Sequence, residues 1–247
     1  MHIKTVETQD MKWVNITQVN AETIEYLKKN YNFHHLDLED VHDDLQTPKL
    51  DTYKNYIFLV LQLPLWDETS DRIISYEIDI FVTGKTLITI HKNESVLLNQ
   101  FFHIKMTIKR MQKDWMGSST GYILSPLIKT LFKNTEPMIN SIGRHLSYLE
   151  EHIFDGEHDQ ATVQQLAIER RNILHIRRTI DPQRYLIANL SHIRKPFINE
   201  DTSIYFDNVH DYLNKTWSVL QTYKDIIEGL HVTVESLITQ RTNRIIG

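Results

Sequence analysis

The chain has 247 residues, of which 41% are hydrophobic, and a formal net charge of −5 at pH 7. This length allows one large domain or two smaller ones, and the negative charge excludes a general attraction to nucleic acid. The absence of cysteine excludes disulfides and thiolate metal sites.

The first part of the chain alternates between strand and helix patterns, which is typical of a mixed α/β domain. Alternating or continuous apolar residues predict strands over residues 12–16, 56–63, 73–82 and 86–91. The turn at 83–85 joins the last two of these strands as a hairpin. Helical spacing predicts helices over residues 21–30 and 36–45, with Leu38, Val41 and Leu45 on the buried face of the second. The longest apolar stretch, residues 56–66, is too short to cross a bilayer, and the N-terminus has no signal-peptide pattern.

The pattern becomes nearly all helical at about residue 118, where serine and threonine favour a helix start. We expect an antiparallel hairpin of helices over about 118–153 and 161–180, joined by a polar turn at 154–159. Asp181-Pro182 is expected to kink or stop the second helix, and residues 191–201 are expected to form a loop. The predicted division is an α/β/α domain with a mixed sheet at 1–117, a helical hairpin at 118–198 and a long helix at 199–247, which gives an α+β fold.

The last helix carries a heptad stripe, in which apolar or interfacial residues alternate at spacings of three and four over many turns. Its members are Phe206, Val209, Leu213, Thr216, Leu220, Tyr223, Ile227, Leu230, Val234 and Leu237. Such a stripe predicts lengthwise packing against other helices, and on a monomer we expect it to be exposed, which favours a weak oligomer. The chain stops on Ile245-Ile246-Gly247, and we interpret this as a longer protein whose helix continues, rather than a terminus docked on a core.

Motifs of known enzymes are absent from the sequence. Gly84-Lys85-Thr86 lacks the upstream glycine of a phosphate-binding loop, since that position is Asp79, and predicted strands flank it on both sides. No nucleophile elbow, dinucleotide fingerprint or zinc-protease motif occurs. We therefore do not expect an enzyme.

Two polar clusters are candidates for holding a divalent cation. The denser one spans residues 34–44, where acidic side chains line both flanks of the predicted helix, and carboxylates without thiolates suit a hard cation. The other lies at the start of the last helix, with Asp207, Asn208, His210 and Asp211. A solvated acidic helix face explains the first cluster by spacing alone, and the favourable effect of acids near a helix N-terminus explains the second.

Several segments together resemble the cytoplasmic part of the CorA family of divalent-cation channels. The resemblance covers essentially the whole chain, in the family's order, and rests on residues 33–41, which match an F-h-P-L-x-L-E-D motif, and on 48–51, 56–61, 87–91, 205–211, 223–230 and 242–246. It implies that the last helix is the stalk of a homopentamer and continues into a first membrane span that is missing here. It also implies that Mg²⁺ bound between subunits holds the channel closed.

The resemblance carries over to individual residues. Asp40 and Glu39 match the acids of the L-E-D motif, and Asp211 matches the second stalk acid. Asn208 replaces the family's frequent stalk aspartate, so Asp207 is the expected substitute. The expected metal residues are therefore Asp40, Glu39, Asp207 and Asp211. Asn243 matches a polar pore-lining position, and Ile246 stands where the family often has methionine.

The resemblance implies a non-enzymatic, metal-sensing domain on the cytoplasmic side of the cell membrane, part of a magnesium or cobalt channel. Weak regulatory Mg²⁺ is the expected ion, with Co²⁺ and Zn²⁺ as further candidates. A zinc-transporting relative is one alternative, for which the 13 histidines are a faint hint. A soluble coiled-coil scaffold without metal function is the other.

Overall fold

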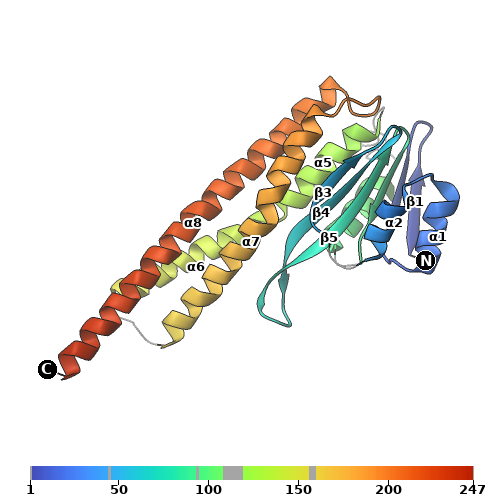
Figure 1. Cartoon of the computed structure of the whole chain (residues 1–247). Helices are drawn as coiled ribbons and strands as arrows, with labels where there is room; N and C mark the ends of the chain where they lie inside the picture. The colour runs from blue at the N-terminus through green and yellow to red at the C-terminus, as the bar shows by residue number, and fades with distance from the viewer. Residues whose placement is uncertain (1, 44–45, 93–94, 108–118, 156–159, 247) are drawn as a thin grey trace.

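The computed structural model describes residues 2–43, 46–92, 95–107, 119–155 and 160–246. An N-terminal sheet is followed by long helices that run along one of its faces (Figure 1). The strands are β1 (Ile3–Glu7), β2 (Lys12–Ile16), β3 (Lys49–Thr52), β4 (Tyr56–Asp67), β5 (Arg72–Thr83) and β6 (Thr86–Ile90). The helices are α1 (Ala21–Asn30), α2 (His35–His42), α3 (Val96–Thr107), α5 (Thr120–Lys133), α6 (Glu136–Phe154), α7 (Gln160–His192) and α8 (Glu200–Ile246).

In the described part of the chain the sheet has six strands, in the order β1-β2-β6-β5-β4-β3. Only β2 and β6 pair in parallel, and the other pairs are antiparallel, so the sheet is mixed as predicted. The central strands are apolar on both faces, which requires a layer of helices on each side.

Two hydrophobic cores form on the two faces of the sheet. The smaller core holds Leu27 of α1 and Leu38 and Val41 of α2, packed against side chains such as Phe58 and Phe81. The larger core lies on the opposite face and contains the apolar residues of α3, α5, α6, α7 and α8. The sheet therefore separates α2 from α8.

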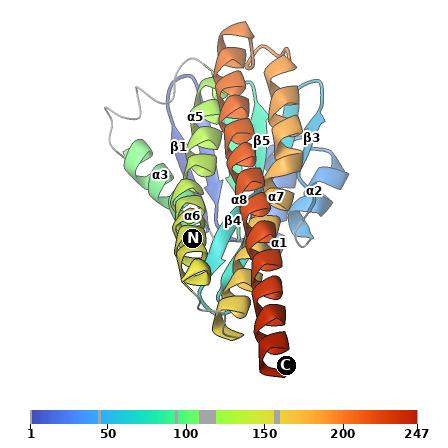
Figure 2. The ribbon, with the colours of Figure 1, turned by 90° about the vertical axis from the view of Figure 1, so that its left-hand side faces the viewer.

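The heptad stripe of α8 is buried within the single chain, because α8 packs lengthwise against α7, α5 and α6 (Figure 2). Phe206, Val209, Leu213 and Leu220 have no exposed surface, and Ile227, Leu230 and Val234 are at most 5% exposed. The expectation that a monomer exposes this stripe was wrong. Helices of the same chain cover it, so the stripe is no evidence for an oligomer.

Helix α7 continues through Pro182, which was expected to kink or stop it. An internal proline costs roughly 3 kcal/mol in a helix, so contacts elsewhere must offset that cost. One such contact is the fully buried Gln183, whose side chain accepts from the Gln62 amide at 3.0 Å and donates to the Gln62 carbonyl at 2.5 Å. The side-chain amide of Gln183 thereby provides hydrogen-bond partners for the backbone N–H and C=O of Gln62 on β4, at a position that β3 does not pair with.

The predicted bounds of β2 and α1 are confirmed, and β4, β5 and β6 lie where strands were expected. The structure adds β1, β3 and α3, and it starts α8 at Glu200, one residue after the predicted start of the long helix at 199 and within the loop expected at 191–201. Helices α5 and α6 meet at Asn134 and Thr135, where one helix was expected. The predicted turn at 154–159, the boundary near 117 and the core position of Leu45 lie partly or wholly outside the described residues. None of the described helices is long and apolar enough to cross a membrane.

Candidate metal centre

Helix α2 carries the acidic candidate residues on the face of the sheet opposite α8. The helix begins after His34, whose imidazole Nδ1 accepts from the Leu36 amide at 3.3 Å. Leu38 and Val41 anchor it against the sheet, as the sequence predicts. Since α2 turns once every 3.6 residues, this anchoring directs its acids to different surroundings.

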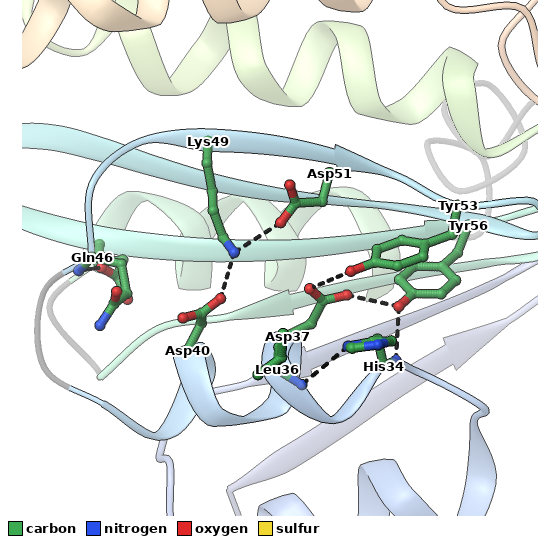
Figure 3. Close-up of polar contacts among 10 residues, drawn as sticks. His34, Leu36, Asp37, Asp40, Gln46, Lys49, Asp51, Tyr53 and Tyr56 are labelled. Carbon is green, nitrogen blue, oxygen red and sulfur yellow. Dashed lines mark hydrogen bonds and ion pairs between the residues drawn. The ribbon is translucent and has the colours of Figure 1, made fainter.

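Asp37 points into the protein and is only 1% exposed. Its carboxylate accepts one hydrogen bond from the Tyr56 hydroxyl at 2.7 Å and another from the Tyr53 hydroxyl at 2.9 Å (Figure 3). The Tyr56 oxygen in turn accepts from the His34 amide at 2.8 Å. These bonds satisfy a buried carboxylate without a metal, so Asp37 is a structural residue of the α2 layer.

Asp40 is partly exposed and already has a cationic partner. The ammonium of Lys49 on β3 contacts the Asp40 carboxylate and lies 2.8 Å from Asp51 (Figure 3). Partial burial acts to lower the pKa of Lys49, but its bonds to Asp40 and Asp51 outweigh that effect and raise the pKa. The ammonium therefore occupies a position between two carboxylates that a divalent cation could also use. Glu39, the other L-E-D acid, is exposed.

A further carboxylate, Asp79 of β5, is buried on the same face of the sheet. It is 4% exposed, and its Oδ1 has no hydrogen-bond partner among the described residues. Burial, with the nearby charges of Glu77 and Asp40, raises the pKa of Asp79 well above its usual range, against smaller opposing effects of Lys92 and Lys49. A raised pKa favours the protonated, neutral form of Asp79, so this carboxyl contributes less negative charge near Asp40 than an exposed aspartate would.

The stalk acids Asp207 and Asp211 lie about two and three turns after the start of α8, and both are exposed. Asn208, also exposed, accepts a hydrogen bond from the Lys129 ammonium of α5 at 3.0 Å. The side-chain oxygen of Asn208, which stands where the family often has aspartate, is thus already used within the chain.

The expected metal residues do not meet within one chain. Asp40 and Glu39 belong to α2 on one face of the sheet, whereas Asp207 and Asp211 belong to α8 on the other (Figure 1). Among the residues that the structure describes, no group of three or more histidine or acidic side chains is arranged to hold a metal ion. A cation that touches both sets would have to lie between two copies of the chain.

The candidate pore residues lie at the far end of α8. Asn243 is exposed, and Ile246 is the last residue of the helix, with a side chain outside the described part of the structure. Their pore-lining role stays a prediction.

The sequence patterns did not identify Lys49 as part of the site. The signal was available in Pro48-Lys49-Leu50-Asp51, a segment that supports the family resemblance. Its significance depends on the pairing of β3 with β4, which places Lys49 beside α2, nine positions after Asp40 in the sequence.

Comparison with known proteins identifies the family. The family model for the CorA-like Mg²⁺ transporter protein matches residues 8–247. The chain belongs to the CorA family. Because this family consists of ion transporters, the expectation that the chain is not an enzyme is confirmed.

Two curated relatives span the chain. The cobalt/magnesium transport protein CorA of Thermotoga maritima is 24% identical over 94% of this chain, and the match covers 66% of that protein, just under two thirds of its length. YfjQ of Bacillus subtilis, a candidate metal ion transporter, is 28% identical over 98% of this chain and 74% of its own.

Solved structures share the fold. The CorA magnesium transporter of Methanocaldococcus jannaschii superposes with a TM-score of 0.82 at 15% identity, covering 97% of this chain and 74% of that one. The cytoplasmic domain of ZntB from Vibrio parahaemolyticus gives a TM-score of 0.59 at 17% identity, covering 97% of this chain and 90% of that one. These likenesses confirm the predicted α+β architecture with its mixed sheet and long helices.

Proposed function

We propose that this chain is the cation-sensing part of a magnesium transporter that also accepts cobalt, and that it lies on the cytoplasmic side of the membrane. Membership of the CorA family over residues 8–247 is the observation that carries the proposal. In this proposal α8 is the stalk that leads to the membrane, in a homopentamer whose pore is lined by Asn243 and Ile246. The whole transporter's activity is part of the proposal, since the chain matches only 66% of the Thermotoga relative.

The proposed sensing step is a Mg²⁺ bridge between neighbouring copies. Asp40 and Glu39 of one copy would face Asp207 and Asp211 of the next, because the sheet keeps these pairs apart within a copy. Exposed carboxylates brought together repel each other, and a divalent cation converts that repulsion into attraction. Mg²⁺ would then favour the assembled state.

The proposed affinity is low. Lys49 already neutralises part of the charge on Asp40, and Asn208 supplies no charge and accepts from Lys129. By analogy with low-charge calcium sites, we expect a dissociation constant of about 10⁻⁴ to 10⁻³ M. At a dissociation constant of about 1 mM, 10 mM Mg²⁺ would stabilise the bound form by about 1.4 kcal/mol. For a chain of this size that corresponds to a rise in melting temperature of about 3–6 °C.

The test compares melting temperatures with 10 mM Mg²⁺ and with EDTA for the wild type and Asp40→Asn plus Asp211→Asn. The matched control is Glu150→Gln plus Glu151→Gln, which removes the same charge from exposed positions on α6. The proposal expects the Mg²⁺-induced rise in the wild type and control but not in the site variant. An equal rise in all three proteins would show that these acids form an ordinary solvated surface.

Sedimentation of the same proteins across a concentration range separates assembly from binding. The proposal expects Mg²⁺ to shift the wild type and control toward a larger species, and the site variant to remain unchanged. A strict monomer at high concentration with Mg²⁺ would count against an interface role for the stalk acids.

A further inference from the structure

A groove with a basic lining lies between α7 and α8, away from both sets of proposed metal residues. Its volume is about 370 Å³, and its charged or titratable lining residues are Arg170, Arg171, His175 and Arg178 of α7 and His231 of α8. Among the described residues the rest of the lining is apolar and includes no carboxylate, although Glu235 lies 3.4 Å from His231 Nε2 at its edge. The chain as a whole has a net charge of −5, so this concentration of arginine runs against its overall charge.

The helical repeat of α7 accounts for the shape of the lining. Positions 170, 171, 174, 175 and 178 recur at the spacings that place residues on one face of a helix. Leu166 and Ile227, each 1% exposed, form an apolar floor where α7 and α8 touch. The arginines stand on the rim of this floor, so their guanidinium groups can converge on a ligand in the groove.

Two other arginines of α7 are used within the fold. Arg177 donates to Gln221 at 2.6 Å, and Arg184 donates to Asn214 at 2.8 Å and pairs with Asp181 at 2.7 Å. Both guanidinium groups also lie over the ring of Trp217, at 5.3 and 4.6 Å from its centre. These contacts fasten α7 to α8 and explain why both arginines are there.

The groove arginines lack such partners. Among the described residues, Arg170 and Arg178 have no hydrogen bond or ion pair, and Arg171 reaches only the Asp71 carbonyl at 3.5 Å. Glu228, whose charge interacts with Arg170 from a distance, is bound to Lys224 at 2.9 Å. Burial lowers the pKa of His175, and the positive charges of Arg178 and Arg72 lower it further, against a smaller opposing effect of a hydrogen bond with the Ile74 backbone.

We propose that this groove binds an anion that carries two or more phosphoryl groups. Guanidinium groups bind phosphate oxygens through paired N–H donors, and three of them around one groove suit a chain of phosphates better than a single carboxylate. The volume accommodates a di- or triphosphate above the apolar floor. This site goes beyond the proposed cation bridge and shares no residue with it. A soluble polyphosphate and the headgroup of a lipid with two phosphate groups present the same chemistry.

Calorimetry with sodium tripolyphosphate in Mg²⁺-free buffer tests the proposal. The groove variant is Arg170→Gln plus Arg178→Gln, and the control is Lys28→Gln plus Lys29→Gln, the same charge change at exposed positions of α1 on the other face of the sheet. We expect saturable binding by the wild type, at least about tenfold weaker binding by the groove variant, and less than about a twofold change in the control. A third variant, Arg170→Lys plus Arg178→Lys, keeps the charge and should retain intermediate binding.

Sedimentation with vesicles that contain cardiolipin, a lipid whose headgroup carries two phosphodiester groups, distinguishes the source of the phosphate. Binding of tripolyphosphate identifies a soluble ligand, whereas vesicle binding that is lost only in the groove variant, without binding of tripolyphosphate, identifies a headgroup. Absence of binding in both assays would overturn the proposal, as would equal loss in the groove variant and the control. Thermal unfolding of each variant checks that it is folded at the assay temperature.

Discussion

Replacing Asp79 by asparagine should remove a pH-dependent weakness of the fold. The Asp79 carboxyl is buried beneath α2 with one oxygen unpartnered among the described residues, and burial with Glu77 and Asp40 raises its pKa. Lys92 and Lys49 oppose this rise without cancelling it. In the unfolded chain the same carboxyl has an ordinary pKa near 4.

The sign follows from proton binding. Between the unfolded pKa and the raised folded pKa, the folded state holds a proton that the unfolded state has lost. Stability therefore falls as pH rises through this window, with a slope of about 1.4 kcal/mol per pH unit from this one group. An asparagine side chain at this position would be neutral at every pH and similar in shape, so the variant should lose this contribution and gain stability relative to the wild type toward neutral pH.

Urea unfolding in EDTA at half-unit steps from pH 4 to 8 measures the effect. Asp10→Asn, at an exposed position before β2, is the control for a change of one charge. The difference in stability between Asp79→Asn and wild type should grow with pH, while that of the control stays within about 0.5 kcal/mol. A difference that is constant with pH would show that Asp79 is ionised in the folded state and would refute the reasoning.

Other substitutions test packing and the competition at Asp40. Gly121→Ala should destabilise the fold by about 1–3 kcal/mol in urea unfolding, because the new Cβ would lie 2.2 Å from the Phe197 carbonyl oxygen. Its control, Gly229→Ala on α8, meets nothing within 4 Å and should stabilise by up to about 1 kcal/mol; equal effects at both glycines would contradict the packing. Lys49→Met frees Asp40 from its ammonium partner, so calorimetry should show Mg²⁺ binding tighter by about threefold to tenfold. Unchanged affinity would show that Lys49 does not compete with the metal.

The sequence predicted the elements whose periodicity is long or whose ends are marked. The side chain of Asn20 accepts a hydrogen bond from the Thr23 backbone amide at 2.9 Å. This N-cap fixes the start of α1, and asparagine is a preferred residue at that position. The short strands β1 and β3 escaped prediction because they alternate weakly and depend on pairing with β2 and β4. The prediction that Pro182 kinks or stops α7 was wrong, because it used local helix propensity alone. The contact between Gln183 and Gln62, which are 121 positions apart in the sequence, could not be predicted from that propensity.

The residue types of the candidate site were predictable from the sequence, but the partners of its acidic side chains were not. The spacing of Asp37 and Asp40 suggests two equivalent acids. In the structure Asp37 accepts hydrogen bonds from two tyrosine hydroxyls, whereas Asp40 forms an ion pair with Lys49. The partner of each acid depends on how β3 and β4 pack beside α2, and the spacing of residues within α2 does not reveal that packing. The heptad stripe misled in a similar way, since periodicity reports that a helix face is covered but not which chain covers it.

The position of the sheet links metal binding to assembly in the proposed transporter. One cation that contacts both Asp40 and Asp211 requires two copies, since the two residues lie on opposite layers of a single chain. A ligand held only by the assembled state shifts the assembly equilibrium by its binding free energy. Weak individual ligands are then compatible with a strong response, because a ring of copies repeats the same small bridge at each interface. The burial of the α8 stripe within each chain supports this arrangement, since each protomer could keep its fold while the bridges between copies open.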